Sequence, residues 1–363
     1  MTLRVVVDAT AIPGRRVGAG VYVTELLRAV RDADVDLHAF VNQRDRAELA
    51  SLLPRVTLHS VGTRSRLTRI AWAQVVLPLR VRALRADVFH GPHYTIPAGL
   101  PCPSVVTFHD PTFFTHPHVH ERTKVAYFTR VARTGIKRAT RVIAVSEYAK
   151  RGAVEHAGAD PAHLDVVLEG VDLERYQPGD VSGVVPYILF VGALEPRKDV
   201  PTLIDAYAQL AAQGIRHELV LCGLPAWGVE QIEEAIDRSG LKTIRRTGYV
   251  TDEEKIDLYR SASAFVYPSI AEGFGLPVLE AMACGTPTVT TTGSAPEEIA
   301  GDAVILVPPQ RPAALSSAIA RILDEPDLAD DLRRRGPERA KTFTWQRTAD
   351  QTVEVWRRAA AGR

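Results

Sequence analysis

The chain has 363 residues, which corresponds to about two domains of typical size. Its hydrophobic content of 46% and charged content of 24% are those of a globular protein and exclude wholesale disorder and fibrous repeats. Lys and Arg number 44 against 43 Asp and Glu, and this net charge of +1 indicates no nucleic-acid partner.

In the first half, short apolar runs alternate with stretches of helical periodicity, which predicts a doubly wound α/β domain with a parallel sheet buried on both faces. The predicted strands are Leu3–Ala9, Leu37–Val41, Val56–Val61, Asp87–His90, Ser104–Phe108 and Arg141–Val145. The predicted helices lie near Val21–Arg31, Asp45–Leu53, Leu67–Leu84, Glu121–Ala139 and Glu147–His156.

Two glycines, Gly18 and Gly20, follow the first strand and open the first helix. Small residues there leave N–H groups free to hold an anion, although a plain tight turn explains them equally well. A dinucleotide-binding fingerprint needs a third glycine at position 23 and an acidic residue at the end of the next strand. The chain has Val23 at the first position and Asn42 at the second, so the fingerprint is incomplete.

Basic residues are concentrated in the first half. Residues 1–170 hold 23 Lys and Arg against 15 Asp and Glu, a net charge of +8, and residues 171–363 carry −7. No acid interrupts the stretch from Arg55 to Arg85. This asymmetry points to an anionic partner, while a solvated helix face is the simpler explanation of the charge alone.

Four histidines and an aspartate follow the fifth strand: His109, Asp110, His116, His118 and His120. The last three surround a proline in an expected loop and are better explained as loop residues than as metal ligands. His109 and Asp110 stand at the carboxyl end of a strand, where ligands bind in open α/β sheets.

Residues Asp172–Val185 are rich in Pro, Gly and polar residues, which predicts a linker. The alternation then restarts. The predicted strands are Tyr187–Val191, Glu218–Leu221, Ile244–Val250, Ala264–Tyr267, Pro287–Thr291 and Ala303–Val307. Helices are expected to start near Pro201, Val229, Asp252, Pro277 and Pro312, and residues 327–361 to be helical with a break at Gly336-Pro337.

Thr251, with Glu254 three residues later, forms a capping-box pattern that predicts one of these helix starts well. We expect domains at 1–172 and 186–345, with a helix at 346–363 that passes back to the first domain. Because ligands bind beyond the carboxyl ends of parallel strands, the site is expected in the cleft between two such domains.

Arg197 and Lys198 are adjacent cations between a buried strand and a helix. Arg can bind a diphosphate through its planar fork and Lys as a point charge. Exposed cations on a first helical turn are the alternative, but cations oppose the positive helix N-terminus unless an anion binds there.

A glycine-rich loop, Gly273-Phe274-Gly275-Leu276, lies between a strand and a helix whose first turn contains Pro277. Its N–H groups can receive phosphate or sugar oxygens. Glu272 and Glu280 flank it, and carboxylates there suit ligand hydroxyls rather than phosphate. A simple helix-dipole role explains one acid but not the whole arrangement.

On these residues the chain resembles the retaining glycosyltransferases of family 4, and in particular a bacterial mannosyl- and rhamnosyltransferase branch. Glu272 and Glu280 match the family's pair of glutamates, and Arg197-Lys198 match its diphosphate-binding turn. Gly18 and Gly20 match the glycine loop on the acceptor side. The resemblance implies the GT-B fold of two facing Rossmann-like domains.

Two positions differ from the family pattern. Asp199 stands where asparagine commonly follows Arg-Lys, and Glu169 stands where asparagine usually precedes Gly-Val-Asp. Neither replaces a phosphate ligand, although Asp199 weakens the local positive field. We interpret both as tuning of activity rather than its loss.

The resemblance implies an acceptor-binding first domain and a second domain that binds the nucleotide diphosphate-sugar. Glu280 is expected on the ribose and Glu272 on a sugar hydroxyl, with His109 stabilising the sugar. The expected catalytic residues are His109, Asp110, Glu272, Arg197 and Lys198. The expected donor-binding residues are Gly18, Gly20, Arg197, Lys198, Glu272, Gly273, Phe274, Gly275, Leu276 and Glu280.

No metal and no cofactor are expected, because Arg197 and Lys198 supply positive charge for the leaving diphosphate. The expected reaction moves a hexose, best mannose from GDP-mannose, to a hydroxyl of a glycan or lipid-linked acceptor. A UDP- or dTDP-sugar donor, a nucleotide-sugar isomerase and a non-catalytic nucleotide-binding protein are alternatives.

Three widely spaced cysteines, Cys102, Cys222 and Cys284, suit a reducing cytosol. The N-terminus lacks the apolar stretch of a signal peptide, and no apolar run reaches about 18 residues. A cytoplasmic protein is therefore expected, with peripheral contact to an anionic membrane through Leu67, Ile70, Ala71, Val75 and Leu79. The arginines around this stripe are Arg64, Arg66, Arg69, Arg80, Arg82 and Arg85.

Overall fold

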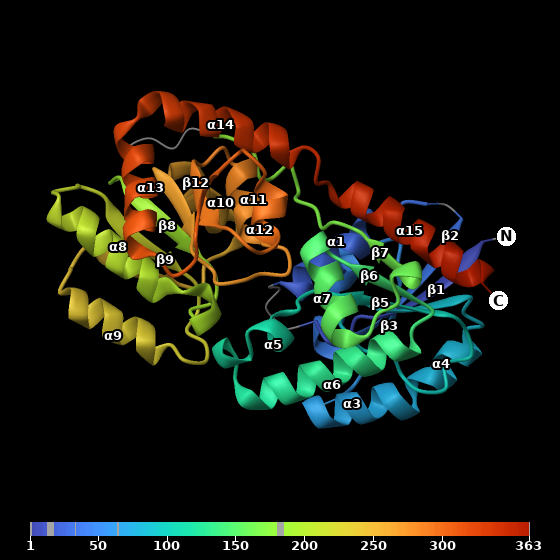
Figure 1. The fold of residues 1–363 in the computed structure, drawn as a ribbon. Helices are drawn as coiled ribbons and strands as arrows, with labels where there is room; N and C mark the ends of the chain where they lie inside the picture. The colour runs from blue at the N-terminus through green and yellow to red at the C-terminus, as the bar shows by residue number, and fades with distance from the viewer. Residues whose placement is uncertain (1, 13–17, 33, 64, 180–184, 363) are drawn as a thin grey trace. The chain divides into compact units, whose positions relative to one another are not determined.

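The computed structural model describes residues 2–12, 18–32, 34–63, 65–179 and 185–362, which divide into two compact units (Figure 1). Unit 1 comprises the ranges Met1–Thr115, Thr123–Gly170 and Trp345–Arg363, and unit 2 comprises His116–Arg122 and Val171–Thr344. Each unit is built on a parallel sheet with helices on its faces. The expected fold class, two Rossmann-like doubly wound domains, is confirmed.

The described residues of unit 1 form a seven-stranded sheet in the order β3-β2-β1-β4-β5-β6-β7, and all its strand pairs are parallel. The strands are β1 (Leu3–Asp8), β2 (Val35–Asn42), β3 (Thr57–Val61), β4 (Val88–Gly91), β5 (Ser104–Phe108), β6 (Arg141–Ala144) and β7 (Leu164–Val166). In register, Val5 pairs with Leu37 on one side and Val88 on the other. Strand β3 stands at one end of the strand order and is therefore an edge strand of the described sheet.

The helices of unit 1 cover this sheet. They are α1 (Ala19–Ala29), α2 (Arg46–Leu52), α3 (Arg66–Val75), α4 (Leu77–Ala83), α5 (Thr112–Thr115), α6 (Arg122–Arg138), α7 (Glu147–Ala157) and α15 (Trp345–Ala361). Helix α15, from the end of the chain, packs on α1 and against β4, β5 and β6.

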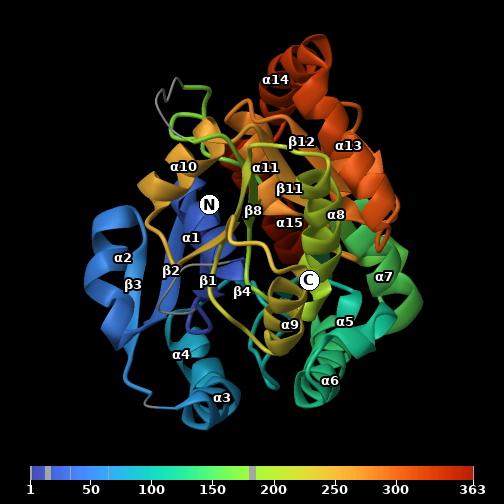
Figure 2. The ribbon, with the colours of Figure 1, turned by 90° about the vertical axis from the view of Figure 1, so that its left-hand side faces the viewer.

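The described part of unit 2 forms a six-stranded sheet, also parallel, in the order β10-β9-β8-β11-β12-β13. The strands are β8 (Tyr187–Val191), β9 (Glu218–Cys222), β10 (Ile244–Gly248), β11 (Ala264–Tyr267), β12 (Thr288–Thr291) and β13 (Ile305–Val307). The helices are α8 (Val200–Ala212), α9 (Glu230–Ser239), α10 (Asp252–Ser261), α11 (Leu276–Ala283), α12 (Ala295–Ala300), α13 (Pro312–Asp324) and α14 (Pro326–Ala340). Helices α8, α9 and α13 lie on one face, and α10, α11 and α12 on the other (Figure 2).

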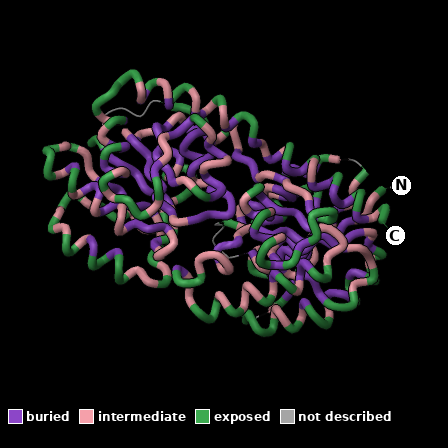
Figure 3. The backbone as a smooth tube through the Cα atoms, in the orientation of Figure 1, coloured by how far each residue is buried: buried purple, intermediate pink, exposed green. Residues whose placement is uncertain are grey.

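The strands supply the core of each unit. Strands β5, β8 and β11 are buried at every position, as the near-continuous apolar runs of parallel strands predict (Figure 3). This burial fixes the carboxyl ends of the strands, and the loops that follow them carry the candidate site.

Two expectations about helices are wrong. The single helix expected over Leu67–Leu84 is divided into α3 and α4, because Pro78 cannot donate a hydrogen bond and begins a new first turn. The break expected at Gly336-Pro337 is absent from the described helix α14, which continues to Ala340. Gly336 is needed for packing: a Cβ atom there would lie 2.9 Å from the Met282 carbonyl oxygen of α11.

Candidate active site

A turn with two cations follows the buried strand β8 in unit 2. It contains the short 3₁₀ helix η4 (Pro196–Lys198), and Lys198 is buried. Asp199 then takes a left-handed conformation with φ of 49° before α8 begins. This conformation is uncommon for a residue with a side chain, and aspartate and asparagine tolerate it best.

Glu272 lies between the two cations. Its Oε1 atom accepts hydrogen bonds from Lys198 Nζ at 2.7 Å and from the Tyr267 hydroxyl at 3.2 Å, while Oε2 forms an ion pair with Arg197. Lys198 Nζ also donates to the Tyr267 hydroxyl. We call Arg197, Lys198, Tyr267 and Glu272 the cation cluster.

Electrostatics keep Glu272 charged in spite of its burial. Burial raises the pKa of Glu272, but the charges and hydrogen bonds of Arg197 and Lys198 outweigh it and lower that pKa to about 2. Burial, with the neighbouring charge of Arg197, lowers the pKa of Lys198. Glu272 is thus a carboxylate at neutral pH that fixes the positions of both cations.

Glu280 belongs to a second cluster. Its Oε1 accepts from Lys255 Nζ at 2.9 Å and its Oε2 from the Tyr259 hydroxyl at 2.9 Å. Burial lowers the pKa of Lys255, but the charge of Glu280 more than compensates and raises it. Lys255 and Tyr259 were not predicted, because they come from α10, whose approach to α11 the sequence does not reveal.

The glycine-rich loop lies next to the cation cluster in sequence and begins α11. Gly275 is the N-cap with φ of 103°, in the left-handed region that favours glycine, and Pro277 occupies the first turn. In the described residues, no backbone acceptor is recorded for the N–H groups of Phe274 and Leu276. The N-terminus of α11 can therefore receive an anion or a hydroxyl oxygen.

In unit 1, His109 is fixed through both of its ring nitrogens. Nε2 donates to the Pro92 carbonyl oxygen at 2.7 Å, since a carbonyl oxygen can only accept. Nδ1 lies 3.3 Å from a carboxylate oxygen of buried Glu169. The sequence singled out Glu169 as unusual but not as a partner of His109.

Asp110 and the two glycines of unit 1 have local structural roles. The Asp110 carboxylate accepts from the Thr112 N–H at 2.8 Å and so orders the turn into α5. Gly18 is the N-cap of α1, with φ of 50°. Gly20, with Asp8 and His93, lines a small hollow of about 190 Å³ at the carboxyl ends of β1 and β4. Burial raises the pKa of Asp8, although hydrogen bonds from Thr10 oppose this.

The described residues contain no group of three His, Cys, Asp or Glu side chains placed to hold a metal ion. In the same part of the chain, none of the helices is both long and apolar enough to cross a bilayer.

Comparisons with known proteins relate the chain to glycosyltransferases. The model of Glycosyltransferase Family 4 matches residues 17–175, and that of Glycosyl transferases group 1 matches residues 181–339. O-antigen chain mannosyltransferase B of Escherichia coli is 31% identical over 302 residues, which is 80% of this chain and 77% of that protein. D-inositol 3-phosphate glycosyltransferase of Rhodococcus jostii is 32% identical over 57% of this chain, and this match spans half of the relative's length.

Two solved structures share the fold along nearly the whole chain. Sucrose-phosphate synthase of Thermosynechococcus elongatus superposes with a TM-score of 0.79 at 22% identity, covering 99% of this chain and all of that one. HepE of Anabaena in complex with UDP-glucose gives 0.78 at 19% identity, covering 97% of this chain and 98% of that one. At these identities the likeness concerns the fold alone.

Proposed function

Since the chain belongs to glycosyltransferase family 4 and is therefore an enzyme with a nucleotide-sugar donor, we propose that it moves a hexose to a hydroxyl of a glycan or glycolipid with retention of anomeric configuration. Mannose from GDP-mannose is the donor this proposal favours, because the relative that matches 80% of the chain is a mannosyltransferase. A UDP-sugar is the second candidate, since the structure of HepE was solved in complex with UDP-glucose.

The observation that carries the proposal is the pairing of Glu272 with Arg197 and Lys198. Adjacent cations fixed in a buried turn are preorganised for the negative charge that develops on a leaving diphosphate. Their charge does the work a divalent cation does in other enzymes, so the proposed reaction requires no metal.

The two glutamates retain capacity for ligand hydroxyls. A carboxylate has about four acceptor sites. Glu272 uses three of them on Arg197, Lys198 and Tyr267, which leaves one for a sugar hydroxyl. Glu280 uses three as well, on Lys255, Tyr259 and Tyr176, and the remaining one suits a ribose hydroxyl.

In the proposed reaction, the bond between the anomeric carbon and the diphosphate oxygen breaks, and a bond to the acceptor oxygen forms on the same face. The leaving phosphate oxygen takes the acceptor proton. His109 and Asp110 are the proposed residues of unit 1 that approach the sugar. The contact of His109 with Glu169, the longer of its two, is the one that a sugar hydroxyl would replace.

A donor panel tests the proposal. Thermal unfolding is measured with GDP-mannose, UDP-glucose, a dTDP-sugar and an ADP-sugar, and GDP-mannose is expected to stabilise most. A ligand at about 100 times its Kd contributes roughly 2.7 kcal/mol. No stabilisation by any of them would contradict nucleotide-sugar binding. Conversion of the donor to an isomer without an acceptor would identify an isomerase instead.

We also propose that unit 1 binds the anionic inner face of the cell membrane through α3 and α4. Leu67, Val75 and Leu79 are 79%, 68% and 64% exposed, so these side chains do not pack on the sheet. Exposed Arg66, Arg82 and Arg85 accompany them, and Arg64 lies outside the described residues. Each cation near an anionic leaflet contributes about 1 kcal/mol.

A further inference from the structure

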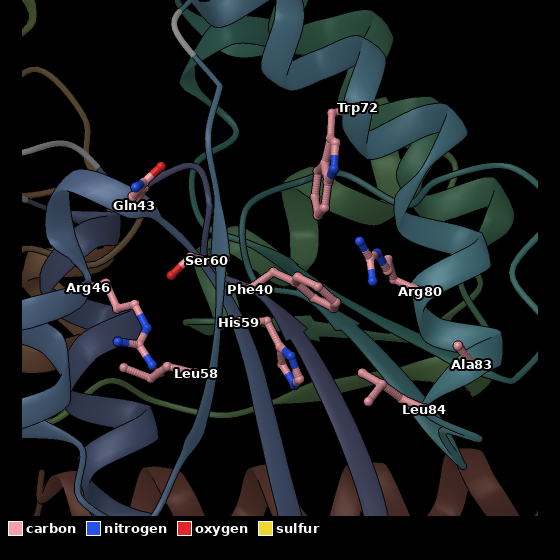
Figure 4. Close-up of a pocket in the computed structure, with 10 residues that line it drawn as sticks. All are labelled: Phe40, Gln43, Arg46, Leu58, His59, Ser60, Trp72, Arg80, Ala83 and Leu84. Atoms are coloured by element: carbon pink, nitrogen blue, oxygen red, sulfur yellow. The ribbon is translucent and has the colours of Figure 1, made fainter.

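A hollow of about 640 Å³ lies along the open edge strand of the unit 1 sheet, apart from the clusters described above (Figure 4). We call it the β3-edge hollow. It is lined by Phe40, Gln43, Arg46, Leu58, His59, Ser60, Trp72, Arg80, Ala83 and Leu84. Ligand sites for small molecules typically occupy about 300–1,000 Å³, so the hollow has the size of a binding site.

The charge in this hollow is of one sign. Arg46 comes from α2 and Arg80 from α4, and no acidic residue is among the lining side chains. Within the part of the chain that the structure describes, neither arginine side chain has an ion pair or a hydrogen bond. Two arginines without carboxylate partners can bind a phosphate or carboxylate in a charge-assisted, bidentate manner.

An aromatic wall lies between the arginines. Figure 4 shows Phe40 and His59 on the strands, with Arg46 and Gln43 on one side and Trp72 and Arg80 on the other. The Phe40 ring centroid lies 4.9 Å from that of His59 and 5.5 Å from that of Trp72. Burial, with the charges of His38 and Arg80, lowers the pKa of His59, so its ring is neutral at pH 7.

Phe40 is buried, while the half-buried rings of His59 and Trp72 can accept the apolar face of a ligand ring, and Gln43 and Ser60 offer polar groups for hydroxyls. An inorganic ion would use only the arginines and leave the half-buried rings of His59 and Trp72 uncovered. A lipid tail would use the wall and leave the arginines unpaired. A ligand with a ring, hydroxyls and one anionic group uses all three features.

We propose that the β3-edge hollow binds an anionic saccharide, a sugar ring that carries a phosphate or a carboxylate. Such a ring occurs both in a free glycan and in a lipid headgroup, and the chemistry that recognises it is the same. The hollow is thus a second carbohydrate site, and its occupation does not require transfer by the cation cluster.

Fluorine NMR of protein labelled with 5-fluorotryptophan tests this proposal. The chain has four tryptophans, and a Trp72→Phe variant identifies the Trp72 resonance. Glucose 6-phosphate and glucuronate are titrated as probes, with glucose, inorganic phosphate and sugar-free anionic vesicles as separate arms. Glucose 6-phosphate is expected to move the Trp72 resonance, with glucose and phosphate each weaker by about tenfold or more.

Three arginine variants locate the binding. Arg46→Gln and Arg80→Gln are each expected to weaken binding of glucose 6-phosphate by about tenfold. Arg82→Gln is the matched control, since Arg82 is an exposed arginine of α4 outside the hollow, and it should leave the affinity unchanged. Saturating GDP should also leave the titration unchanged.

Several results would overturn the proposal. One is a Trp72 resonance that does not move with either probe up to about 10 mM, because binding would then be weaker than about 2.7 kcal/mol. Another is a response to phosphate or to sugar-free vesicles as strong as to the sugar phosphate, because the hollow would then recognise charge alone. Loss of the response with GDP would place the ligand elsewhere.

Discussion

The buried carboxylates Glu272 and Glu280 each have cationic partners in unit 2. Removing one member of a buried ion pair typically costs about 3–5 kcal/mol, because its partner stays buried and unpaired. Glu272 has two cationic partners and Glu280 has one, so substitution by alanine would confuse ligand binding with stability. Glutamine keeps the volume and one acceptor oxygen and is the better probe of both sites.

The two glutamates are expected to differ in ligand specificity. Glu280→Gln should weaken GDP and GDP-mannose alike, by about tenfold or more, because the ribose is common to both. Glu272→Gln should weaken the binding of GDP-mannose and leave the affinity for GDP nearly unchanged, because the proposed contact of Glu272 is with the sugar, which GDP lacks. Calorimetric titration of both folded variants with both ligands measures this. Identical profiles would contradict the assigned roles.

Asp199 is expected to reduce stability at neutral pH. Burial raises its pKa to about 6, and its Oδ2 atom has no recorded hydrogen-bond partner in the described structure. The folded state therefore holds a proton below about pH 6, whereas the unfolded chain loses it near the ordinary value of 3.8. Stability is lost as the pH rises through this window.

Asp199→Asn removes this dependence and keeps a residue that tolerates the left-handed backbone. The variant should match the wild type near pH 4 and exceed it by up to about 3 kcal/mol at pH 7.5 in urea unfolding. Asp237→Asn, at an exposed helix position, is the control and should change stability by less than about 0.5 kcal/mol. A gain that is equal at both pH values would show that burial of charge is not its cause.

Among helices and strands, the sequence predicted the bounds of buried strands and the start of a capped helix, because these features depend on residues that are neighbours in the chain. Strands Ser104–Phe108, Tyr187–Val191 and Ala264–Tyr267 were predicted with their observed bounds, because a buried parallel strand is apolar throughout. The Thr251 capping box is present, with the Glu254 N–H donating to Thr251 Oγ1 at 3.2 Å. The short edge strand β7 was missed, since three residues are too few to show the alternation of apolar and polar residues that marks a strand.

The candidate site was predictable to the same extent. Charged residues in the loops that follow strands were predicted to belong to the site, and the structure brings three of them together: Arg197, Lys198 and Glu272. Tyr267 and Lys255 were not predicted, because a tyrosine ending a strand and a lysine in a helix look like core and surface residues. Their roles arise from tertiary contacts between segments far apart in sequence.

Helices α3 and α4 provide a test of membrane binding. Substitution of Leu67, Val75 and Leu79 by serine should abolish co-sedimentation with anionic vesicles and leave the fold intact, since these side chains are exposed. The wild type should bind anionic vesicles and not neutral ones. Equal binding to both, or binding to neither, would contradict the proposal.

At the scale of the whole chain, the C-terminal helix α15 packs on unit 1, which is otherwise formed by the first half of the sequence. Thr348 Oγ1 donates to the Leu168 carbonyl oxygen at 2.8 Å, and Arg358 forms an ion pair with Asp165 at 2.8 Å. Trp356 is fully buried with its ring near His90. The expected return of 346–363 to the first domain is consistent with this packing, and we propose that α15 is an integral part of unit 1.

Trp356→Ala should therefore destabilise unit 1 by about 3–5 kcal/mol. Urea unfolding followed by the fluorine resonances of 5-fluorotryptophan at Trp72 in unit 1 and at Trp227 in unit 2 distinguishes the two units. The change should appear in the first signal with little effect on the second. An equal shift of both would indicate that the units unfold as one.

The central claim is that Arg197 and Lys198 bind the leaving diphosphate without a metal. Calorimetric titration of GDP and GMP in EDTA tests it most directly, because the two ligands differ by one phosphate. GDP should bind the wild type about tenfold or more tightly than GMP, and this ratio should collapse in Lys198→Met and Arg197→Gln. A preference for GDP that appears only when magnesium or manganese is added, or that survives both substitutions, would contradict the claim.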